Sequence, residues 1–395
     1  MKVAILGGGV AGISTAIALK QRGFDVVVYE RHQGPSNMGA GIVVWPNAAF
    51  VLDQLGVLGE VVAVSGYPEK MQRFSKQGEN LGAIDIDAIN QQMGYASVSV
   101  LRKDFQDILL DQLASLGVAV HYGHTVSHIE TAASGDAVAV FQDGTPICAD
   151  VIVGADGRMA SAARLYVHGD NAPVYQGFIN WVGVYESEEP TFEAIAVEDY
   201  WGVGERFGIV PITKNKAYWA GGVACAELGP NNPAAYQAEL HDLFGDWPEP
   251  VQQMVERTPV DRINKIYVHD HDPIPSWHKN NLIVIGDAAH APLPTSGQGA
   301  CQALEDAWHL ANILGDKPQD LHQAWVKFTE LRVAKTSGIT MAARGFASSL
   351  FNPDENFCAA RNENSKNTDF AQVAAAMARG WSQYLPLSAD GDTSV

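Results

Sequence analysis

The sequence predicts an α/β fold with a parallel sheet, and three features indicate this class. Residues 2–6 and 25–29 are short apolar segments of strand type, and residues 12–22 between them carry apolar side chains at helical spacing. Residues 149–157 begin with an apolar run without alternation, which is typical of a strand buried on both faces. Between residues 174 and 270, β-branched and aromatic runs separated by turns predict a second, mostly antiparallel sheet.

A glycine motif, G-x-G-x-x-G, follows the first strand and consists of Gly7, Gly9 and Gly12. The first glycine permits a tight turn, the second lets backbone approach a pyrophosphate, and the third lets helix and strand pack closely. The helix then offers free N–H groups and its positive dipole end to phosphates. Glu30 ends the second strand where a ribose hydroxyl is held, and Arg31 follows it. This βαβ unit predicts a dinucleotide site.

The bulk composition narrows the possible partners and compartments. The 395 residues suffice for two domains, and the net charge of −19 disfavours nucleic acid or an anionic membrane surface, because such a partner requires positive charge. No apolar run approaches the length of about 18 residues that a membrane span needs. The predicted strand begins at Lys2, which leaves no room for a signal peptide. Four widely spaced cysteines favour a reduced, cytoplasmic protein without disulfides.

The next segment, residues 34–117, contains two candidate ligand contacts. Gly39 and Gly41 suggest a loop that approaches a ligand, although taken by themselves they favour a simple loop. A helix is expected from Pro46, strands and loops of a second layer at 62–97, and a strand with an amphipathic helix at 98–117. Arg102 lies at that strand–helix junction. Because arginine is unfavourable near a helix start, a phosphate partner explains it better than a surface position.

Short strands are expected at 118–122, 126–131 and 137–141, with a hairpin turn at Asp143-Gly144. The buried strand that follows ends in Gly-Ala-Asp-Gly, and its Asp156 lies at the carboxyl end, where ligands bind in parallel sheets.

The predicted antiparallel sheet is rich in aromatic residues. We expect most of them to be core and one face of the sheet to form a wall for a flat organic molecule. Residues 235–257 should be helical. The aromatic residues are Trp181, Tyr185, Tyr200, Trp201, Tyr218 and Trp219.

A second dense stretch, residues 281–314, contains a buried strand, a proline-bearing loop and a helix from about residue 300 to 314. A glycine loop again leads into a helix N-terminus, which predicts a second site for an anion or a carbonyl oxygen. Further helices are expected at 322–344 and 370–379, and the tail from residue 352 is otherwise polar. The candidate ligand residues of this stretch are Asp287, Pro294, Gly297, Gln298 and Gly299.

Three separated stretches, the glycine motif with Glu30, residues 154–157 and residues 286–299, resemble one family in order and spacing. The chain is similar over roughly residues 1–345 to the single-component FAD-dependent aromatic monooxygenases. This family includes para-hydroxybenzoate hydroxylase, salicylate hydroxylase, 6-hydroxynicotinate 3-monooxygenase and FAD-dependent urate hydroxylase.

The resemblance implies a Rossmann-like FAD-binding domain with an inserted, mostly antiparallel β-sheet substrate domain and C-terminal helices. The expected FAD-binding domain is discontinuous, at 1–70, 98–173 and 275–345. The expected substrate domain comprises 71–97 and 174–274, and residues 346–395 form a C-terminal helical segment and tail.

The resemblance also implies roles for individual residues. Glu30 would hold the adenosine ribose, Arg102 the pyrophosphate region and Asp287 the ribityl chain. Asp156 belongs to a D-G motif associated with both FAD and the pyridine nucleotide. The backbone of residues 297–299 would face the flavin pyrimidine edge and stabilise negative charge there. Arg206 and Tyr218 occupy the positions where the urate hydroxylase branch places a flavin-facing arginine and a tyrosine; without that resemblance, Arg206 could equally be a solvent-facing strand residue.

The chain departs from the family pattern at two places. The D-G motif usually continues x-x-S-x-x-R, but here Ser161 and Arg164 come one residue late and Arg158 is an extra basic residue. The urate hydroxylase branch carries a substrate-contacting aspartate before the glycine loop, where this chain has Thr295-Ser296, and this makes urate a doubtful substrate.

Two histidine-containing features receive structural interpretations. His290 is expected to orient its loop rather than to exchange protons with a substrate. The run His-Asp-His-Asp at 269–272 resembles a metal-binding pattern, but flavin oxygenation needs no metal and we expect none.

The expected activity is hydroxylation of a small aromatic or heteroaromatic substrate through a flavin C4a-hydroperoxide, with FAD as cofactor, O2 as oxidant and NADH or NADPH as transient electron donor. Alternatives on the same fold are epoxidation, Baeyer–Villiger or N-oxygenation, and a non-oxygenating flavin dehydrogenase or reductase. A non-catalytic nucleotide-binding module is disfavoured by the intact stretch at 286–299. The expected state is a monomer or homodimer.

Overall fold

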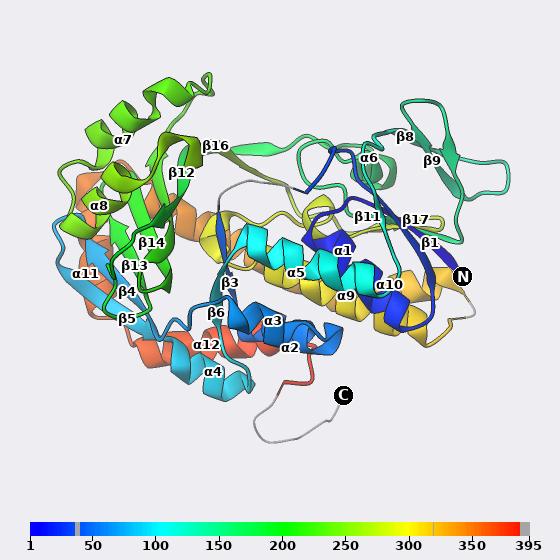
Figure 1. Ribbon diagram of the computed structural model, residues 1–395, viewed down its shortest axis with the longest axis horizontal. Helices are drawn as coiled ribbons and strands as arrows, with labels where there is room; N and C mark the ends of the chain where they lie inside the picture. The colour runs from blue at the N-terminus through cyan, green and yellow to red at the C-terminus, as the bar shows by residue number, and fades with distance from the viewer. Residues whose placement is uncertain (36–39, 319, 388–395) are drawn as a thin grey trace.

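Two large β-sheets lie at opposite ends of the molecule and are connected by long helices (Figure 1). The computed structural model describes residues 1–35, 40–318 and 320–387, so Gly39 of the predicted ligand loop lies outside it. No helix in these ranges is long and apolar enough to cross a membrane.

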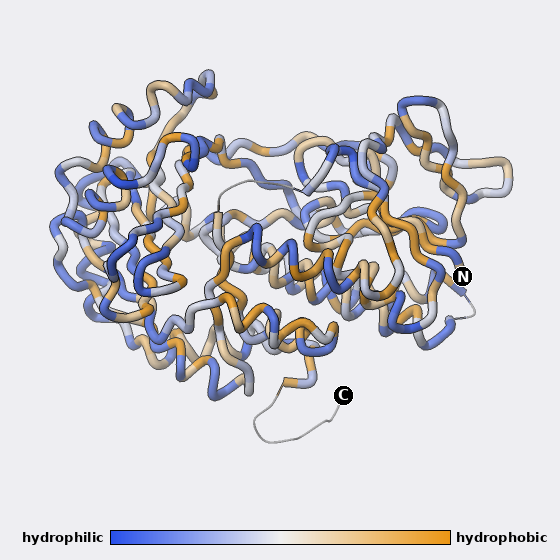
Figure 2. Tube along the Cα trace, viewed as in Figure 1, coloured by the Kyte–Doolittle hydropathy of each residue, from blue (hydrophilic) through white to orange (hydrophobic). Residues whose placement is uncertain are grey.

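The first sheet has six strands in the order β17-β18-β11-β1-β2-β7, and all neighbours are parallel except β17 and β18. The apolar run at 151–154 is its inner strand β11, paired on both sides and fully buried, as predicted. Figure 2 shows these strands as a hydrophobic cluster near the N-terminus. The strands are β1 (Lys2–Leu6), β2 (Asp25–Tyr29), β7 (Val120–His121), β11 (Val151–Gly154), β17 (His278–Lys279) and β18 (Leu282–Val284).

Helix α1 (Val10–Gln21) lies between α5 (Arg102–Ser115) and α9 (Gly299–Gly315). Its residues from 11 to 19 are all buried, because the flanking helices and the sheet cover it on several sides. A small antiparallel sheet and α6 (Ala162–His168) complete this part, and Phe141 of the small sheet packs edge-on against Tyr29 of β2. The small sheet comprises β8 (Val126–Thr131), β9 (Ala137–Phe141) and β10 (Pro146–Ile147).

The second sheet has seven strands in the order β16-β12-β15-β14-β13-β4-β5, and only β13 and β4 are parallel neighbours. The predicted antiparallel run at 174–270 therefore supplies five strands, and the earlier segment adds two at one edge. The strands are β4 (Lys70–Ser75), β5 (Asn80–Asp85), β12 (Val174–Glu186), β13 (Ala196–Trp201), β14 (Glu205–Thr213), β15 (Lys216–Ala224) and β16 (Ile263–Asp270).

One face of this second sheet is an aromatic core. It packs against α7 (Tyr236–Phe244) and α8 (Glu249–Arg257), which were predicted as a single helical region but are separated at Gly245–Pro248. Pro248 is the N-cap of α8, where a missing N–H costs nothing. The aromatic residues on this face include Trp181, Tyr185, Tyr200, Phe207 and Trp219.

The two sheets are joined by a short ladder of β3 (Gly41–Val44) and β6 (Val98–Leu101), and the Ser99 hydroxyl of β6 donates to the Pro211 carbonyl of β14 at 2.6 Å. Three short helices pack nearby: α2 (Pro46–Leu55), α3 (Leu58–Ala63) and α4 (Ile86–Met93).

The C-terminal part contains the long helix α10 (Leu321–Leu350), which runs from α9 to the second sheet, and α12 (Phe370–Ser382), which packs on α4 and β5. Between them is α11 (Glu355–Lys366), which the sequence did not predict. Its buried residues are Cys358, Arg361 and Ser365, so the helical stripe that faces inward is mostly polar and hydrophobic periodicity could not reveal it.

Candidate active site

The glycine motif forms a tight crossing between two loops. Gly7 has φ +117°, and a Cβ atom there would lie 2.1 Å from the carbonyl oxygen of Ala155, which follows β11. A Cβ atom on Gly12 would lie 1.9 Å from the Gly7 carbonyl oxygen. These two glycines are therefore required by the packing of the protein itself.

Gly9, in contrast, faces open space. It is the N-cap of α1, no side chain caps this helix, and a Cβ atom on Gly9 would meet nothing within 4 Å. The first N–H groups of α1 thus remain available beside a surface without side chains. This arrangement fits the phosphates of a dinucleotide.

Glu30 connects the end of β2 to the glycine loop. Its Oε2 atom accepts from the Gly8 N–H at 2.7 Å and its Oε1 atom from the His32 N–H at 2.8 Å. Burial opposes ionisation, but these hydrogen bonds lower the pKa of Glu30 below its ordinary value. Glu30 is therefore an anionic acceptor at neutral pH. The adjacent Arg31 is exposed and forms no ion pair within the described ranges.

The loop after β11 is held by Asp156, which accepts from the Ser161 hydroxyl at 2.5 Å and from the Ala163 N–H at 3.1 Å. Burial raises the pKa of Asp156, although both hydrogen bonds oppose this effect. Arg164 donates to the carbonyls of Ala288 and Ala289 at 3.2 and 3.1 Å. The late serine of the D-G motif thus holds Asp156 within this loop, and the late arginine connects the loop to residues 286–299.

A second connection between the two loops is the ion pair of Arg158 and Asp287, with Nη1 and Oδ2 3.3 Å apart. Both side chains remain partly exposed. The extra basic residue of the D-G motif therefore lies beside the aspartate to which the resemblance assigns the ribityl chain.

The loop that leads into α9 forms a second uncapped helix N-terminus. Gly297 has φ +62° and its carbonyl accepts from the Trp45 Nε1–H at 3.1 Å. Gln298 is the N-cap, but its side chain does not cap the helix and its buried Nε2 atom has no partner in the described protein. Gly299 faces open space, and Pro294 lies exposed at the start of the preceding turn. A carbonyl oxygen or anion fits this position.

A buried charged cluster, which was not predicted from the sequence, supports this second loop. Glu305 and Asp306 of α9 pair with Arg332 of α10, and Lys335 binds Glu305 at 2.8 Å. Asp306 Oδ2 also accepts from the Gly286 N–H at 2.8 Å. A sequence signal was available, because two adjacent acids interrupt the otherwise apolar pattern of α9.

Two contacts extend the cluster to the loop residues. His290 Nε2 lies 2.6 Å from Asp306 Oδ2, and the Asn47 side-chain amide donates to Gln298 Oε1 at 3.0 Å and to Glu305 Oε1 at 2.7 Å. Burial opposes ionisation of Asp306, but the charges of His290 and Arg332 lower its pKa to about 2. The cluster is thus ionised and holds the loop from below.

The face of the second sheet opposite its aromatic core carries Arg206 and small residues. Arg206 Nε donates to Asp199 Oδ1 at 2.5 Å, and Trp201 Nε1 donates to Asp199 Oδ2 at 2.8 Å. Arg206 pairs in register with Gly222, and a Cβ atom on Gly208 would lie 2.8 Å from Arg206 Nη2. The guanidinium group therefore lies across a glycine surface and is mostly buried.

Tyr218 lies on the same face of the sheet, four residue pairs along the β14–β15 ladder from Arg206. A Cβ atom on Gly41 would overlap its ring, at 1.7 Å from Cδ1, so Gly41 permits this contact. Burial raises the pKa of Tyr218, Arg206 lowers it by a smaller amount, and Cys301 in the first turn of α9 raises it further. Tyr218 is thus a neutral phenol that lies against Gly41 of β3, near the first turn of α9.

Arg102 is the first residue of α5 and its side chain is exposed. Its backbone N–H donates to the Ala40 carbonyl at 2.9 Å, but the side chain has no acidic partner among residues 1–35, 40–318 and 320–387. Its proposed phosphate partner remains a prediction.

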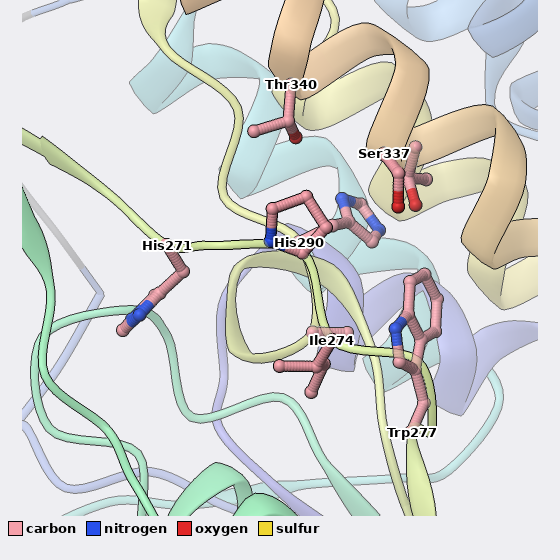
Figure 3. A pocket seen from close by; sticks show the side chains of 9 residues that line it. His271, Ile274, Trp277, His290, Ser337 and Thr340 are labelled. Carbon is pink, nitrogen blue, oxygen red and sulfur yellow. The ribbon is translucent and has the colours of Figure 1, made fainter.

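The histidines at 269–290 have structural contacts. The His269 ring packs at a tilt against the Tyr175 ring, and Asp270 pairs with Arg344 at 2.7 Å. No group of three potential metal ligands occurs in the described part of the chain. Figure 3 shows His290 beside Trp277 under α10, whereas the His271 side chain points away from these two residues. The cavity that the three residues help to line has a volume of about 10 Å³, which is room for about one water molecule.

Comparison with known proteins agrees with this geometry. A family profile described as FAD binding domain matches residues 1–323. The chain is 32% identical to the FAD-dependent urate hydroxylase of Mycolicibacterium vanbaalenii over 350 residues, which cover 87% of each chain. It is 31% identical to the aurachin C monooxygenase/isomerase of Stigmatella aurantiaca, over 85% of this chain and 86% of that protein.

A solved structure of Klebsiella pneumoniae HpxO, complexed with FAD and uric acid, has the same fold. The TM-score is 0.87 and the sequence identity 26%, over 96% of both chains. The match extends over both large sheets and the C-terminal helices.

Proposed function

The chain belongs to the family of FAD-dependent monooxygenases, and from this premise we propose that it hydroxylates a small aromatic or heteroaromatic compound with O2 and NADH or NADPH. The observation that carries the proposal is the position of Tyr218. This phenol lies on the sheet face that bears Arg206, against Gly41 of β3 and near Cys301 in the first turn of α9. Two hydrogen-bonding groups thus lie next to the proposed position of the flavin ring.

FAD, when bound, supplies the redox chemistry and the activation of O2. The residues of this chain would hold it at two helix N-termini. The open backbone at Gly9 and the first turn of α1 would bind the pyrophosphate, with Glu30 at the ribose. The N–H groups at the start of α9 would stabilise negative charge on the pyrimidine edge of the ring.

On the opposite side, the second sheet positions the substrate. Asp199 holds Arg206 by its Nε atom, so the terminal nitrogens of the guanidinium are left to donate to a polar substituent of the ring. Tyr218 donates a second hydrogen bond as a neutral phenol. Gly208 makes room for the Arg206 guanidinium, and Gly222 makes room for Asn180 and Phe351.

The substrate need not be urate. Thr295 Oγ1 donates to the Ala343 carbonyl at 3.1 Å and Ser296 Oγ to the Leu293 carbonyl at 2.9 Å. Both hydroxyls thus serve the local structure, and neither supplies the negative charge of an aspartate. We therefore propose that the substrate is a compound that does not require the substrate-contacting aspartate of the urate hydroxylase branch.

The domain division at 1–70, 98–173 and 275–345 against 71–97 and 174–274 is part of the proposal. Only one dinucleotide fingerprint occurs in the sequence, so the pyridine nucleotide binds transiently rather than in a domain of its own.

The test uses the purified flavoprotein with a panel of aromatic acids, hydroxypyridines and purines. A substrate is expected to accelerate oxidation of NADH or NADPH and to yield a product with one added oxygen atom, while an ineffective ligand yields hydrogen peroxide. Turnover with an artificial electron acceptor under strict anaerobiosis, and no oxygenated product in air, would instead identify a dehydrogenase. A protein that binds no FAD contradicts the proposal entirely.

A further inference from the structure

A second cavity, of about 320 Å³, lies at the edge of the seven-stranded sheet, against the end of α10 and α11. Its size is within the range of pockets that hold small organic molecules. No residue from the loops at 7–12, 154–157 or 286–299 lines it, so it is separate from the proposed flavin site. Its principal lining residues are Arg73, Trp201, Phe357, Arg361, Asn364 and Thr368.

The two arginines of the cavity have different environments. Arg361 donates to the carbonyls of Ser349 and Gly202, each at 2.9 Å, and is therefore satisfied by the protein. The Arg73 side chain forms no hydrogen bond or ion pair with any residue that the structure describes, and its Nε atom is buried without a partner. A guanidinium group with a buried, unpaired nitrogen is costly unless an acceptor binds it.

Two aromatic rings fix the orientation of the Arg73 side chain. Its Cζ atom lies 5.0 Å from the centre of the Trp201 ring and 5.1 Å from the centre of the Phe370 ring. Arg361 Cζ lies 5.3 Å from the same Trp201 ring. A guanidinium fork held in this way is arranged in advance for a planar, bidentate acceptor.

The local charge also favours an anion. Asp199 is the carboxylate that affects both Arg73 and Arg361, but its two oxygens already accept from Arg206 and Trp201. Burial lowers the pKa of Arg73, and Asp199 opposes this only partly. Positive charge thus remains in excess here, although the chain as a whole has a net charge of −19.

We propose that this cavity is a second ligand site, which binds a small aromatic carboxylate. The carboxylate accepts two hydrogen bonds from the Arg73 fork, and the ring lies against the apolar wall of Trp201, Phe357 and Ala360. Asn364 and Thr368 provide polar groups at the rim. The apolar wall distinguishes this ligand from inorganic phosphate or sulfate, which would leave it uncovered.

The experiment measures benzoate binding to the FAD-loaded protein by calorimetry, with the flavin absorbance recorded in parallel. Binding at the second site is expected to leave the flavin spectrum unchanged, because no flavin-loop residue lines the cavity. Benzamide, which has the same ring without the charge, should bind at least about tenfold more weakly. Equal binding of benzamide, or tighter binding of phosphate than of benzoate, overturns the proposal.

Two kinds of variant locate the bound benzoate. Arg73→Gln should weaken the spectrally silent binding at least about tenfold. Ala360→Trp should abolish it by filling the cavity, whereas Ala359→Trp, at the neighbouring exposed position outside the lining, should leave it unchanged. If Ala360→Trp binds benzoate as the wild type does, the site lies elsewhere and the proposal is wrong. Since Ala360 is exposed on α11, this result does not depend on whether Arg73→Gln folds.

Discussion

The two glycine loops of the molecule have the same local form but different supports. Each loop follows a buried strand and leads into a helix, α1 or α9, whose N-terminus no side chain caps. The loop at 7–12 is held by close backbone contacts within itself and with Ala155, together with the Glu30 carboxylate. The loop at 286–299 is held by ionised side chains of α9 and α10.

This difference shows two ways of keeping a ligand-binding backbone in place. The first loop depends on the absence of side chains, so its structure is fixed by steric exclusion. The second depends on charges removed from water, whose attraction must offset a large desolvation cost. A backbone-held loop should therefore be sensitive to added atoms, and a charge-held loop to the loss of one partner.

The largest expected effect is on the charge-held loop. Arg332→Met removes the guanidinium shared by Glu305 and Asp306 and leaves both carboxylates buried with less compensation. We expect a loss of about 3–5 kcal/mol in the free energy of unfolding, measured by urea denaturation. The matched control is Arg379→Met on α12, where the arginine is exposed and the loss should be below about 0.5 kcal/mol. Equal losses in the two variants would contradict the role assigned to the cluster.

For the backbone-held loop, two alanine substitutions separate folding from cofactor binding. Gly12→Ala forces a Cβ atom onto the Gly7 carbonyl and should destabilise the apoprotein by about 3 kcal/mol. Gly9→Ala adds the same atom in open space, so the apoprotein should keep its stability while its FAD affinity, measured by titration of flavin fluorescence, falls at least about tenfold.

The control for this pair is Gly345→Ala in α10, where a Cβ atom also meets nothing within 4 Å and no ligand is expected. It should leave FAD affinity unchanged. Wild-type FAD affinity in Gly9→Ala would show that the pyrophosphate does not lie against this glycine.

The same difference explains how much could be predicted from the sequence. The first loop was predicted in detail, because the strand, the glycines and Glu30 lie within about 30 consecutive residues and follow a known steric pattern. The parallel sheet followed from uninterrupted apolar runs. These features depend on neighbours along the chain, and periodicity reports such neighbours directly.

The support of the second loop could not be predicted in this way. Arg332 lies on the helix that was expected at 322–344, yet this charged residue is fully buried whereas the apolar Leu331 beside it is only half-buried. A charged residue is assigned to the surface unless its partner is known, and here the partners are on another helix. Helix α11 was missed for the same reason, since Arg361 is one of its inward residues.

The second sheet provides a test of the region that faces both loops. Tyr218→Phe removes one hydrogen-bond donor and retains the ring against Gly41, so FAD binding should be unchanged. If the phenol contacts the developing charge, kcat/KM should fall by about ten- to a hundredfold. Because burial raises the pKa of Tyr218, it stays protonated between pH 6 and 9, and the ratio of the two kcat/KM values should be constant over this range.

A suitable control is Tyr384→Phe, at an exposed position near the end of α12, which should alter neither kcat/KM nor FAD binding. A Tyr218→Phe enzyme with full activity would exclude the phenol from the reaction.

The smallest expected effect concerns the pH dependence of stability at the charged cluster. His309 of α9 is buried among these charges, and its pKa is lowered to about 3, mainly by burial and next by Arg332. The folded state therefore holds it neutral, whereas the unfolded chain binds a proton below about pH 6.5. Stability contributed by neutral His309 is present above that pH and falls as the pH decreases toward 3, by about 1.4 kcal/mol per unit.

His309→Gln should reduce the stability lost between pH 7.5 and 5.5 by about 1.4 kcal/mol, whereas His128→Gln at an exposed position should not. An unchanged pH dependence in His309→Gln would mean that His309 titrates in the folded state as it does in the unfolded chain, and that the region under the second loop is open to water rather than sealed by its charges.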